Sequence, residues 1–275
     1  RVSTSPLTTQ VWQELAPKVK SFGFDWIEAP LESLDDLDFN ESAEIIKDNG
    51  LLVSACAAMG PDRDLIHEDK AIRDNGMNYL RGCIDACQVL GATNLVGPLY
   101  SAVGRTWQQT PEDRAKALDL LVDNLSELSE YAEGHGIRMG VEPLNRFETS
   151  FVNLAEQAIE IVDRVDSPAC GIMLDTFHMN IEEKSLAEAI KSTGSRLIQV
   201  HTCENDRGAP GSGQVNWEEV RIGLKDIGYE GPLVIESFTP KVKSIARAAA
   251  IWRPLASSPD ALAKDGIKFL KELMA

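Results

Sequence analysis

Four side chains able to bind a metal or move a proton close four successive apolar segments in the second half of the chain. They are Glu142, Asp175, His201 and Glu236. A carboxylate at the end of a buried segment is costly unless a metal, another cation or a proton compensates its charge. Three carboxylates and one imidazole suit a hard or borderline divalent cation better than a thiolate-type zinc site does. We therefore expect a single metal centre, provided that the fold brings the four side chains together.

Short apolar segments rich in β-branched residues alternate with amphipathic helical patterns along the chain. The strand candidates are 24–30, 51–57, 93–99, 137–143, 170–176, 197–203 and 232–238. The helical patterns lie at 68–91, from Thr110 to Gly134 or Gly136, and at 153–165, 182–193, 216–227 and 258–273. Strands that alternate with helices in this way predict an α/β fold with a parallel sheet covered on both faces.

The number and length of these units favour a (β/α)8 TIM barrel, which takes eight strand–helix units in about 250 residues. Residues 1–5 are interpreted as the remnant of a truncated first strand. A doubly wound open sheet is the alternative, but no GxGxxG motif follows the first strand candidate. No repeat, linker or change in composition divides the chain, so we expect one domain over residues 1–275. In a TIM barrel the C-terminal ends of all strands open on one face, where the four side chains would converge.

Composition and charge argue against two classes of protein. A nucleic-acid binder needs a basic surface, whereas this chain has a formal net charge of −16. No apolar run approaches the roughly 20 residues of a membrane-spanning helix. The five cysteines are odd in number and have no CxxC spacing, so we interpret them as reduced thiols of a cytoplasmic protein.

Four longer motifs resemble the D-tagatose 3-epimerase and D-psicose (allulose) 3-epimerase family, within the xylose isomerase-like TIM barrels. The motifs are GVEPLNRFET at 140–149, LDTFHMN at 174–180, the loop at 200–213 that contains RGAPGSG, and VIESF at 234–238. The resemblance extends over nearly the whole chain, including GFDWIEAPLE near its start and IWRPL near its end. The chain departs from the family in its first strand and in the HTCEND stretch at 201–206, and both departures bear on substrate preference.

The resemblance implies roles for particular residues. The metal ligands would be Glu142, Asp175, His201 and Glu236. The expected ion is Mn²⁺, with Co²⁺ or Mg²⁺ as alternatives. Glu142 and Glu236 would also act as the acid/base pair. Residues expected to contact or enclose the substrate are Glu148, His178, Arg207, Trp107 and Cys56.

The expected reaction is the metal-dependent C3 epimerisation of a free ketose such as D-tagatose, D-fructose/D-psicose or L-ribulose. The proton beside the C2 carbonyl is poorly acidic, and a divalent cation acting as a Lewis acid would stabilise the enediolate that forms when it is removed. Inversion takes a proton from one face of C3 and delivers another to the opposite face. Two carboxylates on opposite sides, such as Glu142 and Glu236, can do this.

Other functions on the same barrel stay open. An aldose–ketose or hydroxypyruvate-type isomerase and an inosose dehydratase would share the fold and the ligand set. A catalytically silent sugar-binding protein is a remoter alternative. The Gly-rich RGAPGSG loop would bind a phosphate if the substrate carried one, and Glu148 would orient Arg146 if it did not face the substrate. The expected partners are a small-molecule ketose and further copies of the chain, in a homodimer or homotetramer.

Overall fold

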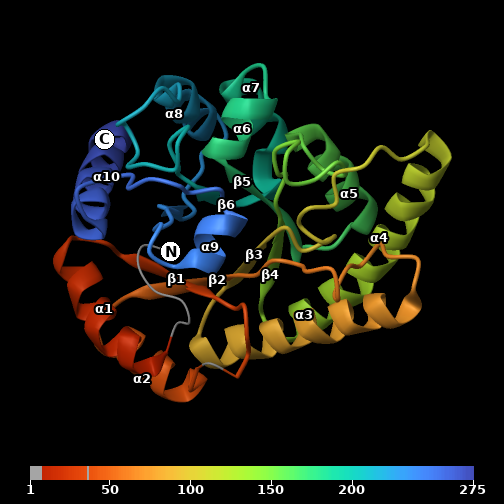
Figure 1. Cartoon of the computed structure of the whole chain (residues 1–275), viewed down its shortest axis with the longest axis horizontal. Coiled ribbons are helices and arrows are strands. Elements are labelled where there is room, and N and C mark those ends of the chain that lie inside the picture. Colours follow the sequence, from red (N-terminus) through yellow and green to blue (C-terminus); the bar gives the residue numbers. More distant parts are fainter. Residues whose placement is uncertain (1–7, 36) are drawn as a thin grey trace.

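Parallel strands form the centre of the molecule, and helices surround them (Figure 1). The computed structural model describes residues 8–35 and 37–275. Its strands are β1 (Trp26–Pro30), β2 (Leu52–Cys56), β3 (Asn94–Gly97), β4 (Arg138–Val141), β5 (Cys170–Asp175), β6 (Leu197–His201) and β7 (Leu233–Val234). They pair in chain order, each parallel to the next, in a seven-stranded, nearly closed barrel. The predicted barrel is confirmed, and the doubly wound alternative is wrong because its strand order would reverse at a switch point.

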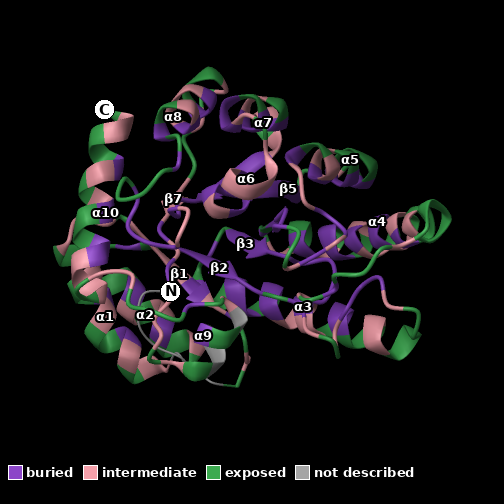
Figure 2. Cartoon of the chain, turned by 45° about the horizontal axis from the view of Figure 1, so that its top comes forward, coloured by how far each residue is buried: buried purple, intermediate pink, exposed green. Residues whose placement is uncertain are grey.

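The helices pack with one face against the strands and the other toward solvent (Figure 2). They are α1 (Thr9–Ser21), α2 (Phe39–Asp48), α3 (Lys70–Leu90), α4 (Pro111–Gly134), α5 (Ala155–Val165), α6 (Thr176–Glu182), α7 (Leu186–Thr193), α8 (Trp217–Asp226), α9 (Lys243–Ala248) and α10 (Pro259–Met274), with a short 3-10 turn at Gly194–Arg196. The start of α4 follows from its sequence: Thr110 Oγ1 accepts from Asp113 N at 3.1 Å, and Pro111 takes the first position.

Some elements differ from the sequence expectation. The patterns at 68–91, 153–165, 216–227 and 258–273 become α3, α5, α8 and α10, whereas α2, α6 and α9 are additional. β7 has only two residues, although the apolar segment predicts a strand over 232–238. The predicted strand remnant at 1–5 lies outside the described residues. Within residues 8–35 and 37–275, no helix combines the length and the apolarity that crossing a membrane takes.

The two ends of the strand ladder face each other across a cavity. It has a volume of about 470 Å³ and is lined by residues of α1, β1, β7 and α10. Apolar side chains such as Trp12, Phe24 and Ile267 dominate this lining. Among the described residues, strand pairing is therefore continuous from β1 round to β7, and the cavity lies between these two strands.

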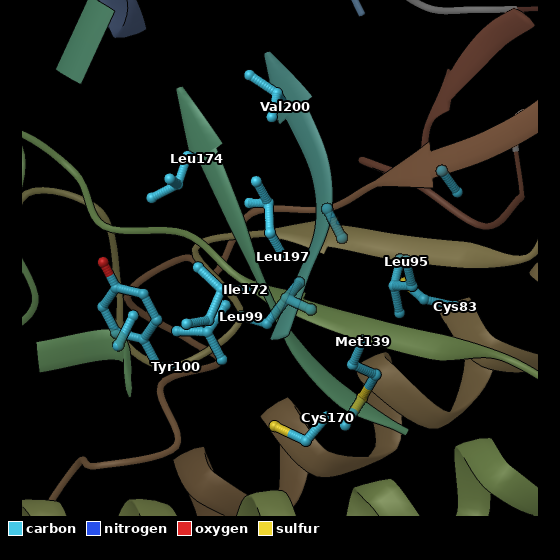
Figure 3. Packing of buried hydrophobic residues seen from close by; sticks show 14 of the residues in the cluster. Cys83, Leu95, Leu99, Tyr100, Met139, Cys170, Ile172, Leu174, Leu197 and Val200 are labelled. Carbon is cyan, nitrogen blue, oxygen red and sulfur yellow. The ribbon is translucent and has the colours of Figure 1, made fainter. Parts of the chain in front are cut away.

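Apolar side chains form two separate layers. The larger layer lies between the strands and the helices. It includes Leu95, Met139, Ile172 and Leu197 of the strands, and Cys83 of α3 lies beside Leu95 (Figure 3). The smaller layer consists of side chains that only strands contribute, and it fills the interior of the barrel. Its members are Cys56, Val96, Met173 and Ile198.

A bulge in β6 decides which of its side chains face the interior. Ile172 pairs with Leu197, but the next residue, Met173, pairs with Gln199, so Ile198 is an extra residue in β6. After the bulge, Val200 packs in the outer layer. Gln199 and His201 therefore point into the barrel, and His201 ends the strand at its mouth.

Candidate active site

Charged side chains from β4 to β7 meet at the mouth of the barrel. Ligand atoms of Glu142, Asp175 and His201 lie within 4.8 Å of one another, and all three residues are buried. Asp175 forms a second group of this kind with Cys203 and Glu236. His201 Nδ1 lies 3.7 Å from Glu236 Oε2, which links the two groups. The four predicted ligands thus lie in one cluster, with Cys203 beside them.

Backbone contacts set the position of Glu142, which directly follows β4. Its N–H donates to Gly97 O at 3.1 Å, and the Tyr100 hydroxyl donates to its carbonyl at 2.9 Å. Gly97 has a φ of 130°, and a Cβ there would lie 2.1 Å from Ala57 O. Only glycine fits this position, because any side chain would push β2 and β3 apart.

The other three side chains come from β5, β6 and the segment after β7. Asp175 and His201 are register partners at the last positions of β5 and β6. Asp175 also begins α6, because its Oδ1 accepts from Phe177 N at 2.7 Å. Glu236 comes two residues after β7 and keeps 14% of its side chain exposed. Strand ends, rather than flexible loops, therefore hold most of the cluster.

The cluster fits a divalent cation. His201 Nδ1 is buried and forms no hydrogen bond with the described residues. Burial acts to lower the pKa of His201, but the charges of Glu28 and Glu236 outweigh it and raise the pKa well above its usual range. A cation bound at Nδ1 would therefore replace the proton that this nitrogen otherwise carries. Three carboxylates supply oxygen donors around it. Buried carboxylates at such distances repel one another unless a cation or protons compensate them.

Arg207 supplies positive charge inside the cluster. Its Nη1 donates to Asp175 Oδ2 at 2.5 Å and to Glu236 Oε2 at 2.8 Å, and it lies 3.4 Å from Cys203 Sγ. The guanidinium stacks on the ring of Phe177, with its Cζ 3.9 Å from the ring centroid. A guanidinium so placed neutralises the same carboxylates that would bind a metal.

Burial and charge shift the pKa values of the two glutamates in opposite directions. Burial raises the pKa of Glu142 well above its usual range, and the charges of Asp175 and Glu236 add to this. Burial also acts to raise the pKa of Glu236, but Arg207 and His201 outweigh it and lower the pKa well below its usual range. One carboxyl group therefore favours its proton and the other favours the ionised form.

His178 faces the cluster from α6. Its Nδ1 accepts from Asn145 N at 3.0 Å, so the neutral ring carries its proton on Nε2. Nε2 lies 3.7 Å from Glu142 Oε1. Arg207 Nη2 lies 3.1 Å from the same nitrogen, and because a guanidinium only donates hydrogen bonds, this contact offers no acceptor to the Nε2–H. Burial and the charge of Arg207 lower the pKa of His178 to about 3. The ring is thus a neutral group fixed in orientation, with an N–H at the mouth of the barrel.

Comparison with known proteins agrees with this geometry. Residues 16–273 match the family model described as xylose isomerase-like TIM barrel. A probable ketose 3-epimerase of Synechocystis sp. is 33% identical over 92% of this chain and 88% of the relative. The D-psicose 3-epimerase of Enterocloster bolteae is 35% identical over 92% and 86%. This chain belongs to the ketose 3-epimerase family. The relatives are carbohydrate epimerases of the isomerase class.

A solved structure supports the same relationship. The D-allulose 3-epimerase from Methylomonas sp., in complex with D-allulose, superposes with a TM-score of 0.92 at 29% identity, covering 98% of this chain and 94% of that one. The predicted resemblance to the 3-epimerases is therefore confirmed over nearly the whole length.

Glu148 contacts Asn145, which also contacts His178, and the side chain of Arg146 has a different partner. Glu148 Oε1 accepts from Asn145 Nδ2 at 2.8 Å. Arg146 instead pairs with Glu182, at 2.9 Å between Nε and Oε1. The alternative that Glu148 orients Arg146 is wrong. Burial raises the pKa of Glu148, although Arg207 acts to lower it.

The RGAPGSG loop uses its amides internally. Gly208 N donates to Asp206 Oδ1 at 2.9 Å, and Gly211 N donates to Glu204 Oε1 at 2.8 Å. Glu204 is fully buried and also accepts from Trp217 Nε1 at 2.6 Å. A phosphate at either of these two amides would meet a carboxylate that already accepts from it.

Trp107 and Cys56 lie at different depths. Trp107 is 54% exposed on the segment after β3, and Arg105 lies over its ring at 4.5 Å. Cys56 ends β2 and belongs to the interior apolar layer with Val96 and Met173. Neither is in the charged cluster, and both stay predictions as substrate contacts.

Sequence reasoning missed several side chains that support the cluster. The ring of Phe177 stacks against the Arg207 guanidinium, and Asn145 forms hydrogen bonds with both His178 and Glu148. Glu28 on β1 contacts Nε2 of His201, whereas Glu236 lies near Nδ1 of the same ring. An acid inside the apolar segment 24–30 is the same signal that reveals Glu142, so Glu28 could have been found in the same way.

Proposed function

We propose that this protein epimerises free ketoses at C3 by the two-base route, with Glu142 and Glu236 as the acid and base. One observation carries the proposal: these glutamates come from the outer two of four consecutive strands, and Asp175 and His201 lie between them. A substrate held over the central pair then has one carboxyl group on each side. Inversion needs this arrangement, whereas an isomerase that works on one face of C1 and C2 does not.

Each glutamate handles a proton on its own face of C3. An ionised carboxylate takes the C3 proton, and the protonated partner returns one to the opposite face of the enediolate. The opposite pKa shifts of Glu142 and Glu236 support such a pair, because one group holds its proton while the other has lost it. The roles exchange when the reaction runs backwards.

The cation belongs between the same strands. We assign its ligands as Glu142, Asp175, His201 and Glu236, and Mn²⁺ as the ion. When bound, the cation supplies Lewis-acid stabilisation of the negative charge that develops on the substrate. The Arg207 guanidinium, which contacts Asp175 and Glu236, then has to turn toward the substrate oxygens.

Neighbouring side chains orient the sugar. In this proposal the His178 Nε2–H and Arg207 donate hydrogen bonds to substrate oxygens near C2 and C3. Glu148 accepts a hydrogen bond from a substrate hydroxyl group. Trp107 and Cys56 are proposed as parts of the pocket wall. We favour free ketoses over ketose phosphates because carboxylates already occupy the Gly-rich loop amides.

We propose that the protein works as one domain, in the cytoplasm, and as a homodimer or homotetramer. Five buried cysteines that form no disulfide bonds with one another support a reducing compartment. Exposed aromatic side chains support self-association: Phe147 is 75% exposed and Trp252 is 74% exposed. Light scattering coupled to size-exclusion chromatography measures the assembly directly.

Incubation with Mn²⁺ and D-fructose, D-tagatose or L-ribulose in heavy water tests the reaction. The expected products are C3-epimeric ketoses that carry deuterium at C3, identified by chromatography and NMR. Aldose products would instead establish the isomerase alternative. Full retention of the original hydrogen at C3 of an epimerised product would reject the two-base route, because both bases exchange protons with solvent.

A further inference from the structure

Glu28 is a buried carboxylate outside the proposed ligand set. It lies on β1, and only 5% of its side chain is exposed. Its register partner on β2 is Ser54, and Cys56 of the same strand belongs to the apolar layer that fills the barrel interior. A carboxylate in such a place is retained only where donors compensate it.

Three donors converge on this carboxylate. Oε2 accepts from Ser54 Oγ at 3.2 Å and from the Nε2 amide of Gln199. The oxygen of the same Gln199 amide, Oε1, accepts from Asn94 Nδ2 at 3.4 Å. This contact fixes the orientation of the amide, so that its NH₂ group faces Glu28. The third donor is His201, whose Nε2 lies 3.0 Å from Oε1 and 3.1 Å from Oε2. The carboxylate is thus held from β2 and β6, with both oxygens toward the imidazole.

This contact determines which nitrogen of His201 is free. An ionised carboxylate only accepts hydrogen bonds, so Nε2 carries the hydrogen, and a ring with one proton then has its lone pair on Nδ1. Nδ1 points to the mouth of the barrel, where it lies 3.7 Å from Glu236 and lacks a hydrogen-bond partner among the described residues. A ligating histidine whose other N–H is held by a carboxylate is a common arrangement at metal centres.

We propose that Glu28 is a positioning residue of the metal centre: it holds His201 in the tautomer and ring orientation that present Nδ1 to the cation. Ser54, Gln199 and Asn94 hold Glu28 in turn. The assignment rests on the proposed metal centre but not on the proposed reaction. Glu28 touches neither the substrate nor the cation, and it acts through the imidazole alone.

Manganese binding to chelator-treated protein, measured by calorimetry, tests this role. Glu28→Gln keeps the shape of the side chain and removes its charge, so Mn²⁺ affinity should fall about 10–100-fold. Glu219→Gln is the matched control, because Glu219 also accepts from a hydroxyl and two backbone N–H groups, but between α7 and α8. The control should bind Mn²⁺ as the unmodified protein does.

A double-mutant cycle separates positioning from a general structural effect. In a His201→Gln background the further change Glu28→Gln should alter Mn²⁺ affinity less than about threefold, because the residue through which Glu28 acts is gone. Equal losses in both backgrounds, or normal affinity in Glu28→Gln alone, would overturn the assignment. If Glu28→Gln does not fold, Gln199→Met offers a milder form of the same test, with a smaller loss that again depends on His201. Because the readout is metal binding, an inactive protein that shows the coupling still supports the assignment.

Discussion

The ends of β4 to β7 and the ends of β1 to β3 meet the same barrel mouth with opposite chemistry. The first group carries Glu142, Asp175, His201 and Glu236, and the helix and loop behind them add His178 and Arg207. The second group leads into buried apolar residues, which are Leu31, Ala57, Met59 and Leu99. We refer to these two groups as the charged half and the apolar half of the mouth. On the basis of the proposed function, we propose a division of work, in which the charged half performs the reaction and the apolar half lies toward the rest of the sugar.

Metal removal should have the largest effect on turnover, because the metal centre lies in the charged half. Treatment with EDTA is expected to abolish turnover, and Mn²⁺ or Co²⁺ should restore it. The cation binds only the folded protein, so it should also stabilise the fold by about 2.7 kcal/mol at a concentration of 100 times Kd. Activity assays and thermal unfolding with and without Mn²⁺ measure both effects. Full activity in a sample verified to contain no metal would contradict the proposal that the charged half works with a bound cation.

Loss of either glutamate should come next in size. Glu142→Gln and Glu236→Gln keep an oxygen that can bind the metal, but neither can accept a proton. A fall in kcat of about 10²–10⁴-fold is expected for each, which is the range for one general acid or base. Metal content measured on the same samples separates lost proton transfer from lost binding. A variant that holds its metal and turns over normally would show that the missing carboxylate is not a base.

The charged half is also the part that the sequence reveals best. An acid or histidine that ends an apolar segment is a local signal, and the alternation of segments places all such ends on one face. Arg207 is different, since its contacts depend on a backbone φ of 67°, a conformation that residues other than glycine rarely adopt. Glu28 and His201 are 173 positions apart, so no local pattern indicates that they touch. α6 also escapes prediction, because Asp175 both ends β5 and caps the helix, with no turn between them.

The apolar half should discriminate weakly among substrates. An apolar wall rejects an added or missing hydroxyl by only about 10–200-fold. Hexuloses and pentuloses should therefore both turn over, with kcat/KM values within that range, while the 2-keto-3-hydroxy unit stays essential. Steady-state kinetics on D-tagatose, D-fructose and L-ribulose measure this. A terminal phosphate should lower kcat/KM, and a clear preference for the ketose phosphate would contradict the separation of the two halves.

The smallest expected effect is the pH dependence that His178 of the charged half gives to the free energy of unfolding. His178 has a pKa of about 3 in the folded protein and 6.5 as its usual value, so between these pH values the unfolded chain binds the extra proton. Stability contributed by the neutral ring is therefore present above pH ~6.5 and is lost as the pH falls. For one group of this kind, the free energy of unfolding should drop by about 2 kcal/mol between pH 7 and pH 5.

The comparison of His178→Asn with the unmodified protein isolates that contribution, because every other titrating group is common to both. Urea unfolding at pH 7 and pH 5, with chelator present so that metal release does not interfere, gives the two free energies. The variant should lose less stability than the unmodified protein over this interval, since asparagine takes up no proton. An equal loss in both would mean that His178 takes up its proton at the same pH in the folded protein as in the unfolded chain. The ring would then be charged at pH 5 and would not be held neutral by its surroundings.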